Sequence, residues 1–520
     1  MDQIRDGNGK AMSAARHHDW LNVLEAGAVG DGSASCTAAL QRAIDRCAEN
    51  GGGTVFIPAG KYVTGTLWLR SNIILHLDAG ATILGQTDLG AYPIWTSRWE
   101  GPNVQSSYAP LIAGEGLTNV ALTGRGVIDG RGQFWWDLFH RHKLSSVRPN
   151  LLRMVDCRDV LIDGNTFINS PRWTLNPTAC ENLTITNVTI RNPHDSPNTD
   201  GINPDSCSNV HISNCHIDVG DDCITIKSGS EEDGRRTPRS CYNVTISNCT
   251  MLHGHGGVVI GSEMSGGVRN VAISNCVFYG TERGIRLKSR RGRGNAVEDL
   301  RVDNIVMNRV LCPIVLNMFY VCGAAEKRLL DPSPQPVNAG TPQFRRLRFS
   351  NITAREVKYA AAFILGLPEM FVDDIVLDGI SIYLDPNNKQ GGSPAMTAEV
   401  LDMCRAGLVL KNARNVKLRR IDIYDQLGPA VIVNNSQDIL VSDLYASMDG
   451  QGPLVLVDGV DSSAPDEDDT PTDGPMPPHH DGDGRRVRTF IRGRRFGRRS
   501  RNAADAALSK LTAESSPDLA

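Results

Sequence analysis

The 520-residue sequence has no uninterrupted run of about 18 apolar residues, which excludes a membrane-spanning helix. It also has no excess of positive charge, because 54 Lys and Arg stand against 58 Asp and Glu for a net charge of −4. Without a global positive field, nucleic acid is not expected as the main partner, and no membrane partner is expected either. The composition is that of a soluble chain with 40% hydrophobic residues, enough to bury a large core.

Two further absences concern the compartment. The number of cysteines is odd, 13, so they cannot all pair within one chain, and a framework held entirely by disulfides is disfavoured. The first residues, MDQIRDGNGKAMSAARHHDW, lack the apolar core and the small-residue cleavage site of a signal peptide. The sequence therefore favours a cytoplasmic location over secretion, and it does not predict an oligomeric state.

What the sequence does have is an internal repeat. One short pattern recurs as NLTITNVTI, NVHISNCHI, NVTISNCTM and NVAISNCVF, starting at residues 182, 209, 243 and 270, with looser copies from 119 to 446. Each copy alternates apolar and polar residues, as a strand with one buried face does. Short strands that repeat without helices between them indicate a parallel β-helix, in which each copy is one coil and neighbouring coils bury each other's apolar face.

Two columns of equivalent positions support this fold. The first contains only asparagines, which tolerate left-handed backbone angles and whose amides can bond from coil to coil: Asn187, Asn214, Asn248, Asn275, Asn304 and Asn351. A turn ladder is favoured over a catalytic role for them. The next position mixes cysteine with aliphatic residues: Val188, Cys215, Cys249, Cys276, Ile305 and Ile352. Such a column is an interior stack of free thiols rather than a metal or redox site.

The two ends of the chain differ from the repeats. Residues 1–19 are expected to be flexible, and Thr37 to Glu49 has helical periodicity followed by Asn50-Gly51, a helix stop signal. A helix there would cap the first coil and block edge-to-edge strand addition. The catalytic β-helix is predicted over 20–459. Residues 460–520 are first acidic and Pro-rich and then Arg-rich, a pattern that predicts a disordered tail, although the basic run could also hold an acidic polymer.

Chemically active side chains concentrate in four consecutive coils, in the segments NTDGINPDS, GDDCITIKS, GHGGVVIGS and TERGIRLKS. They can be aligned on one apolar column: Ile202, Ile224, Val258 and Ile285. Two residues before this column stand Asp200, Asp222, Gly256 and Arg283, and one residue earlier stand Thr199, Asp221, His255 and Glu282. One residue after it stands Arg286, and Lys288 projects from the same strand face as Arg286.

This alignment places Asp200 and Asp222 one coil apart, about 4.8 Å, with Asp221 aimed toward His255. Carboxylates so close should titrate together, with one proton retained more strongly. Glycoside cleavage needs that difference, because one carboxylic acid protonates the leaving oxygen while another carboxylate activates water. Arg286 and Lys288 would bind an anionic sugar, in a cationic patch with Arg290 and Arg291. Each segment alone could be an ordinary turn, and acidic turns can also bind Ca²⁺, but together they favour a catalytic site.

The same motifs carry a resemblance to a known family. Four short motifs resemble the signature motifs of the polygalacturonases, glycoside hydrolase family 28: Asn198-Thr199-Asp200, Gly220-Asp221-Asp222, Gly254-His255-Gly256 and Arg286-Leu287-Lys288. The segment GVIDGRGQFWW at 126–136 also resembles the N-terminal region of this family. The resemblance covers about residues 20–450. It implies a single right-handed parallel β-helix that hydrolyses α-1,4 galacturonosyl bonds of polygalacturonate or pectin with inversion and without a cofactor or metal.

Site roles follow from this resemblance motif by motif. It implies that Asp221 is the general acid, that Asp200 and Asp222 position and activate the water, and that His255 supports the acid. It further implies that Asn198, Arg286, Lys288 and, on a looser match, Tyr320 bind the uronate. An inverting site needs carboxyl groups ~6.5–9.5 Å apart, so we expect Asp221 to lie farther from Asp200 and Asp222 than these two lie from each other.

Several alternatives stay open at this stage. The segments NPDSCSNVHISN and GSEMSGGVRNVAISN resemble the bacterial branch of the family, where exo-acting enzymes are frequent, and long gaps between repeats could supply loops that close one end of a cleft. A rhamnogalacturonan or xylogalacturonan hydrolase of the same fold is the nearest alternative. A Ca²⁺-dependent pectate lyase and a non-catalytic β-helical carbohydrate-binding protein represent other classes.

Overall fold

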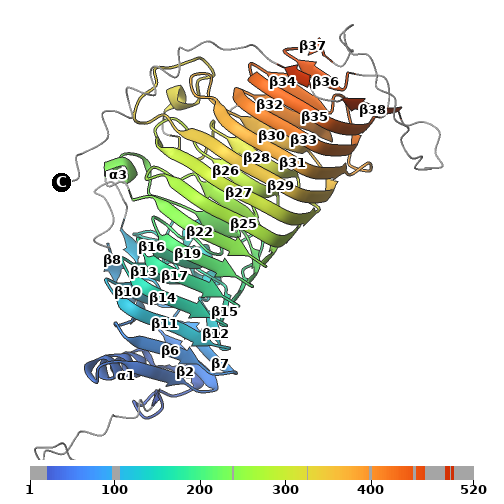
Figure 1. Cartoon of the computed structure of the whole chain (residues 1–520). Coiled ribbons are helices and arrows are strands. Elements are labelled where there is room, and N and C mark those ends of the chain that lie inside the picture. Colours follow the sequence, from blue (N-terminus) through green and yellow to red (C-terminus); the bar gives the residue numbers. More distant parts are fainter. Residues whose placement is uncertain are drawn as a thin grey trace, which may run out of the picture.

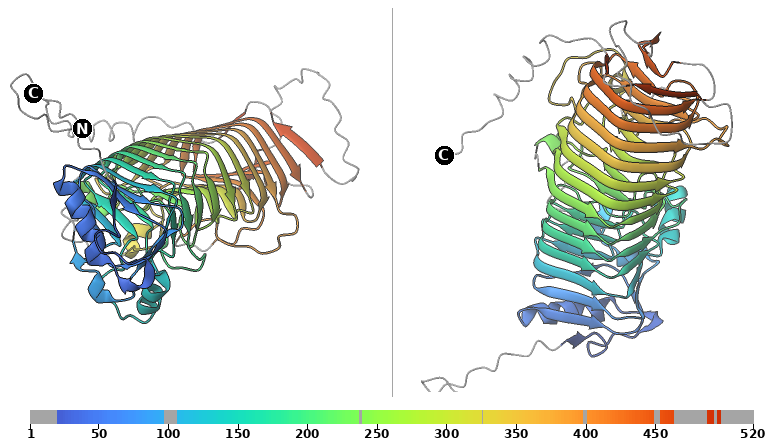
Figure 2. Two further views of the ribbon diagram at one scale, coloured as in Figure 1. Left: turned by 90° about the horizontal axis from the view of Figure 1, so that it is seen from below. Right: turned by 45° about the vertical axis from the view of Figure 1, so that its right-hand side comes forward.

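The computed structural model describes residues 20–96, 106–236, 239–324, 326–397, 401–448, 453–462, 487–491 and 494–496. These residues form an elongated stack of β-coils, with the first coils at one end and the last at the other (Figure 1). Figure 2 shows the same stack from its N-terminal end and from the side. The fold is the predicted right-handed parallel β-helix. Within the described residues, no helix is both long enough and apolar enough to cross a membrane.

The larger of the sheets, which we call the long sheet, has 24 strands. Its early coils contribute pairs of short strands: β1 (Leu21–Asn22), β2 (Asp31–Ser35), β3 (Gly53–Ile57), β4 (Gly60–Thr64), β6 (Ile73–Leu77), β7 (Ala81–Gly85), β11 (Thr118–Gly124), β12 (Val127–Asp129), β14 (Arg158–Asp163), β15 (Thr166–Ile168), β17 (Glu181–Thr186), β18 (Thr189–Arg191), β19 (Ser208–Ser213), β20 (His216–Val219), β22 (Cys241–Ser247) and β23 (Thr250–His253). Later coils contribute single longer strands: β25 (Val268–Tyr279), β27 (Ala296–Asn308), β29 (Gln343–Val357), β31 (Val372–Leu384), β33 (Ala413–Gln426) and β35 (Gln437–Met448).

The opposite wall, which we call the site sheet, consists of two sheets joined through single bridges of Ile202 and Asp205. Ile202 pairs with Leu175 and Ile224, and Asp205 pairs with Thr178 and Lys227. Its first part contains β5 (Leu67–Trp68), β10 (Ile112–Glu115), β13 (Leu152–Val155) and β16 (Leu175–Thr178). Its second part contains β21 (Ile224–Ile226), β24 (Val258–Gly261), β26 (Arg283–Lys288), β28 (Cys312–Asn317), β30 (Ala360–Leu365), β32 (Ala406–Lys411), β34 (Val431–Asn434), β36 (Val455–Val457) and β37 (Val460–Asp461).

Interior columns of apolar side chains hold the coils together. In the long sheet one column consists of Ile185, Ile212, Ile246, Ile273, Val302, Phe349, Leu377, Leu418 and Val441, all fully or almost fully buried. The predicted cysteine column is also buried, with Cys276 aligned on Ile305. A second buried cysteine group, not predicted, consists of Cys157, Cys180, Cys207 and Cys241, and all 13 cysteines are free thiols.

All six residues of the predicted asparagine column are left-handed, with φ between 51° and 56°. The first three lie between paired short strands, whereas Asn275, Asn304 and Asn351 lie within β25, β27 and β29. The amides of this column form only part of a ladder: Asn304 donates to Asn275, whereas Asn187 and Asn351 donate to Asp163 and Asp303. The longer ladder occupies the first residue of each repeat, where Asn182, Asn209, Asn243 and Asn270 bond in series at 3.0–3.2 Å. Each of these repeats has two left-handed asparagine positions, and aligning the repeats in the sequence does not tell at which of them the amides of neighbouring coils come within hydrogen-bond distance.

The N-terminal end is closed as predicted. Helix α1 (Thr37–Glu49) lies across the first coil and buries its apolar side, including Leu40, Ala43 and Ile44 (Figure 1). Two further helices, α2 (Gly132–His140) and α3 (Glu231–Arg236), lie in insertions between coils. The hairpin of β8 (Ile94–Trp95) and β9 (Ser107–Tyr108) belongs to another insertion.

The C-terminal end differs from the prediction of a wholly disordered 460–520. In that segment the structure describes β38 (Val487–Ile491) and β39 (Arg494–Phe496), and both pair antiparallel with β35 of the last coil. These eight residues therefore extend the long sheet. The predicted flexibility of 1–19 and the predicted disorder in the rest of the tail beyond 462 concern residues outside the described part of the chain.

Candidate active site

The site sheet brings the four predicted segments together in the predicted register. Ile202 pairs with Ile224, Ile224 with Val258, and Val258 with Ile285. Positions that precede this column by two residues, including Asp200 and Asp222, are therefore stacked on neighbouring coils, with strands about 4.8 Å apart. The alternating pattern determines this register, because a slip by one residue would expose the whole apolar column.

Three carboxylates meet on these coils. One oxygen from each of Asp200, Asp221 and Asp222 lies within 4.8 Å of the corresponding oxygens of the other two. Asp200 and Asp222 are buried, whereas the Asp221 side chain is 18% exposed and is the carboxylate that faces solvent most. Among the described residues this is the one group of acidic, His or Cys side chains close enough to share a metal ion. Lys288 contacts Asp222 of this group, so a side chain of the protein already neutralises part of its negative charge.

The Asp200 carboxyl accepts hydrogen bonds from Asn203 Nδ2 at 3.2 Å and Thr225 Oγ1 at 3.4 Å. Burial, with the negative charges of Asp221 and Asp222 added to it, raises the pKa of Asp200 to about 8. Of the three carboxyl groups, Asp200 is therefore the one that holds a proton most strongly at neutral pH.

Asp221 and His255 lie on neighbouring coils and form a hydrogen-bonded pair. The Oδ1 of Asp221 lies 3.2 Å from His255 Nδ1 and accepts a hydrogen bond of 2.9 Å from the backbone N–H of Asp222. Burial alone would raise the pKa of Asp221, but the His255 hydrogen bond and the charges of His255 and Lys288 outweigh it and lower this pKa to about 2. The same hydrogen bond raises the pKa of His255.

Asp222 is held by two cations from β26. Lys288 Nζ donates to its Oδ2 at 2.6 Å, and Arg286 Nη1 lies 3.6 Å from its Oδ1. The ring of Tyr320 lies beside both cations, 5.4 Å from Lys288 Nζ and 5.7 Å from Arg286 Cζ, and burial raises the pKa of its hydroxyl. Arg286 Nη2 is buried and has no hydrogen-bond partner among the residues that the structure describes, so it could pair with an oxygen of a ligand.

Gly256 makes room for this arrangement. It occupies the column of Asp200 and Asp222, and a Cβ at its position would lie 2.4 Å from Val259 Cγ2 and 3.3 Å from Asp222 Oδ1. The structure shows that Gly256 leaves space for Asp222 and Arg286.

Asn198 is exposed in a left-handed turn at φ 57°, and its side-chain oxygen accepts a hydrogen bond of 2.7 Å from Arg148. Arg148 also donates to the carbonyls of Pro171 and Pro197, so it fixes the turn that carries Asn198. Sequence analysis missed Arg148, because it lies in an insertion 50 residues before Asn198 and belongs to no motif.

Lys227 was present in the motif segment but was not assigned a role. It is buried, its Nζ bonds Glu263 at 2.8 Å, and its charge opposes the rise of the Asp200 pKa. The five-residue separation from Asp222 hides this relation in the sequence, whereas the structure pairs Lys227 with Asp205 on the neighbouring coil.

The predicted cationic patch is only partly correct. Arg286 and Lys288 face the carboxylates, but Arg290 and Arg291 are buried in ion pairs. Arg290 bonds Glu231 of α3 and the carbonyls of Cys322 and Gly323, and Arg291 forms a bidentate pair with Glu369. These two arginines anchor loops, and a sequence count of positive charge could not reveal their distant acidic partners.

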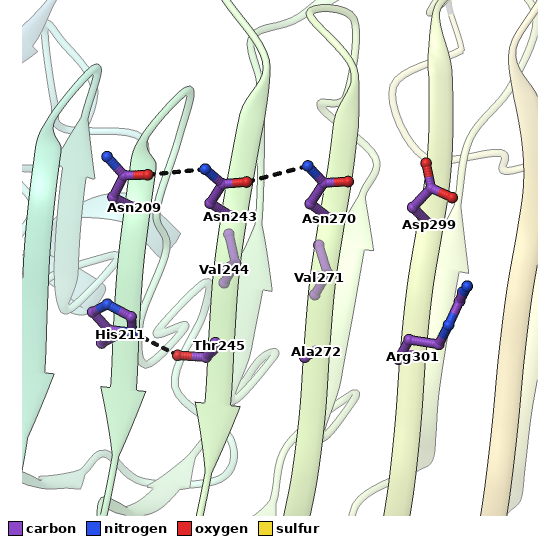
Figure 3. Close-up of a pocket in the computed structure, with 10 residues that line it drawn as sticks. All are labelled: Asn209, His211, Asn243, Val244, Thr245, Asn270, Val271, Ala272, Asp299 and Arg301. Carbon is purple, nitrogen blue, oxygen red and sulfur yellow. Dashed lines mark hydrogen bonds between the residues drawn. The ribbon is translucent and has the colours of Figure 1, made fainter.

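A hollow lies on the long sheet and is separate from this site. It has a volume of about 620 Å³ and is lined by side chains of β19, β22, β25 and β27 (Figure 3). The asparagine ladder forms one side of it, and His211 bonds Thr245 on another. None of the side chains of the carboxylate site lines this hollow.

The right-handed parallel β-helix with a coupled carboxylate cluster, flanked by an arginine and a lysine, is the architecture of a polysaccharide-cleaving glycosidase. The sequence model of "Glycosyl hydrolases family 28" matches residues 47–390, and the chain belongs to this family of glycoside hydrolases. The resemblance stated from the motifs is thereby confirmed.

Individual relatives agree with this assignment. A probable polygalacturonase of Vitis vinifera is 34% identical over 389 residues, which are 73% of this chain and 77% of the relative. An exopolygalacturonase of Zea mays is 27% identical, over 71% of this chain and 85% of the relative. The crystal structure of a hyperthermoactive exopolygalacturonase from Thermotoga maritima aligns with a TM-score of 0.63 at 27% identity, covering 92% of this chain and 95% of that one.

Proposed function

We propose that the protein hydrolyses α-1,4 galacturonosyl bonds of polygalacturonate or pectin oligosaccharides, from a chain end and with inversion. The observation that carries this proposal is the triad of carboxylates within 4.8 Å, with Lys288 and Arg286 directly against one of them. Such a site can protonate a glycosidic oxygen, activate water and bind a uronate carboxylate at the same place. Membership of family 28 supports the reaction, and the polygalacturonase relatives support the substrate.

In the proposed mechanism Asp221 is the general acid, and Asp200 and Asp222 hold the attacking water. His255 donates to Asp221, and Asn198, Arg286, Lys288 and Tyr320 bind the uronate. In the free site Asp200 holds a proton most strongly, so catalysis requires Asp221 to gain one. A substrate carboxylate that pairs with Lys288 raises the pKa of Asp221, because it cancels a charge that lowers it; the same charge also lowers the pKa of Asp200, which rises with it.

The distance between carboxylates bears on the stereochemistry. The nearest oxygens of all three lie within 4.8 Å, so Asp221 is not set well apart as expected, and ~5–5.5 Å between carboxyl groups is typical of retaining enzymes. The anomer of the first product tests inversion directly. Proton NMR of the first product from polygalacturonate should show the β-anomer at the new reducing end, and the α-anomer would contradict inversion.

The activity itself is tested with polygalacturonate and a reducing-end assay. Wild type should release reducing ends, and Asp221→Asn should lower kcat by about 10²–10⁴-fold, the range expected for loss of a general acid. Unchanged release by Asp221→Asn would contradict its role. A rise in ultraviolet absorbance that a chelator abolishes would indicate a lyase instead, and no cleavage at all would indicate a binding protein.

Exo action is proposed because the segment after β31 lies against the site. Arg283 donates to the carbonyls of Ser393 and Pro394, and Asn317 donates to that of Met396. The exopolygalacturonase relatives also support it. Chromatography of early products should show only monomer or dimer, whereas a ladder of sizes would show endo action. The release of reducing ends from rhamnogalacturonan and xylogalacturonan should be measured in parallel. Faster release from either of them than from polygalacturonate would identify that polymer as the substrate instead.

A further inference from the structure

Trp173 occupies a distinctive place in the site sheet. Leu175 pairs with Ile202, so Trp173 stands one coil before Asp200 in the column that continues through Asp222. The backbone confirms this register, because the N–H of Thr174 bonds the carbonyl of Asp200 at 2.8 Å. The backbone of Trp173 is therefore adjacent, on the N-terminal side, to the coil that carries Asp200, about one strand spacing away.

Two cations contact the Trp173 ring. Arg172 Cζ lies 4.2 Å from the ring centroid and Lys227 Nζ lies 4.7 Å from it, both within the range of cation–π attraction. Lys227 is 4% exposed and fixed by Glu263, whereas Trp173 and Arg172 are half-buried. The ring is thus held from the interior by a buried ammonium and keeps part of its surface open to solvent.

This combination matches the chemistry of a uronic acid residue. A pyranose ring has an apolar face that can lie against an aromatic ring, and a uronate adds a carboxylate that a guanidinium can bind in bidentate fashion. A sugar on the Trp173 ring would be the neighbour of the sugar bound at Lys288 and Arg286, with the glycosidic bond between them at the carboxylates.

We propose that Trp173 and Arg172 form a second uronate-binding subsite beside the catalytic carboxylates, and that Lys227 is a positioning residue for the indole. This inference rests on the proposed function and adds the site that holds the sugar on the N-terminal side of the bond. It assigns two of the cations near the reaction centre to different sugars, Arg172 to one and Lys288 to the other.

The test measures binding in the full chain with Asp221→Asn present, so that substrate is not consumed. Isothermal titration with trigalacturonate should show about tenfold weaker binding when Trp173→Ala is added, and binding within about threefold of the parent for Trp173→Phe. The matched control is Trp20→Ala, since Trp20 is a half-exposed tryptophan on the long-sheet side that packs on Phe56 and His76. It should leave the affinity unchanged. Affinity within twofold of the parent for Trp173→Ala would overturn the subsite.

The carboxylate part is tested by Arg172→Gln with trigalacturonate and with the neutral galactose trisaccharide. The substitution should weaken binding of the uronate at least fivefold and leave binding of the neutral sugar unchanged. An equal effect on both ligands would overturn the assignment of Arg172 to the carboxylate.

The positioning role of Lys227 needs variants that keep the fold. Lys227→Met combined with Glu263→Gln removes both members of the buried pair, and Lys227→Arg preserves the cation. The double variant should weaken trigalacturonate binding severalfold while Lys227→Arg restores it, and tryptophan fluorescence should shift only in the double variant. Weak binding in both, or in neither, would overturn the role.

Failure of the subsite can be told apart from failure of the proposed function. If the Asp221→Asn parent binds trigalacturonate and Trp173→Ala binds it equally well, only the subsite is wrong. If wild type neither binds trigalacturonate nor releases reducing ends from polygalacturonate, both proposals are wrong.

Discussion

Asp200 shows how a single residue balances stability against function. Burial raises its pKa to about 8, above the ordinary value of 3.8, so between these pH values the folded state binds a proton that the unfolded state has lost. Stability must therefore fall as pH rises through this window, because the unfolded state releases the proton more readily. The carboxylate is retained at a cost to the fold, which is consistent with a role in catalysis.

The prediction at this scale concerns Asp200→Asn, which removes the titrating group and can still accept from Asn203 and Thr225. The thermal midpoint of the variant should exceed that of wild type by a few degrees at pH 8, and this difference should vanish near pH 4. Activity on polygalacturonate should fall by at least about a hundredfold. Differential scanning calorimetry across pH checks the first part, and a midpoint below wild type at pH 8 would contradict the sign of the pKa shift.

Single residues also mark the limit of sequence analysis. The alternation of apolar residues was enough to place Asp200, Asp221, Asp222 and His255 in one cluster, because the pairing of coils follows from burial of one face. The roles of Arg148 and Lys227 were missed, since they depend on contacts with carbonyls and carboxylates far away in sequence. Arg290 and Arg291 were misplaced for the same reason.

At the scale of elements, the strands of the long sheet carry polar ladders that change character along the stack. Asparagines bond in series from Asn182 to Asn270, and the next positions in the same column are Asp299 and Arg346, which form an ion pair. Further on, Arg348 binds Asp374 and Arg414 binds Asp373. All these contacts join neighbouring coils on the outside of the long sheet. They supplement the apolar columns inside, which hold the same coils together from the other face.

The prediction for this element uses Asn243, which donates to Asn209 and accepts from Asn270 at φ 56°. Asn243→Ala should destabilise the protein by about 2–3 kcal/mol, from two hydrogen bonds at about 0.5–1 kcal/mol each and about 1 kcal/mol for a left-handed alanine. Asn243→Gly, which tolerates this φ, is the matched control and should cost less. Urea unfolding followed by circular dichroism measures both, and equal costs would show that the backbone angle contributes nothing.

At the scale of the whole molecule, the two ends of the stack are closed differently. Helix α1 covers the first coil, whereas the last coil pairs through β35 with the antiparallel strands β38 and β39 (Figure 1). An open parallel edge would present unpaired backbone groups to other chains. The sequence indicated the helix by its periodicity and stop signal, but the high charge of the Arg-rich segment concealed its capacity to add strands.

The prediction for the whole molecule compares two truncations. Ending the chain at residue 462 removes β38 and β39, and with them eight paired residues whose hydrogen bonds contribute about 0.5–1.5 kcal/mol each. The thermal midpoint should fall, and light scattering should detect self-association. Ending the chain at residue 496 keeps both strands and should behave like the full chain. Equal behaviour of the two truncations would show that the strands do not protect the edge.

The stacking of Ile202, Ile224, Val258 and Ile285 has a consequence for how such a molecule can change in length. The spacing of adjacent strands sets the distance between the coils that carry Asp200 and Asp222. It does not depend on a long side chain that reaches across a gap. A whole coil inserted between Trp173 and Tyr320 would therefore split the site by one full step. Coils gained or lost outside that interval would leave the chemistry intact, so the catalytic unit behaves as an indivisible block within an otherwise extensible rod.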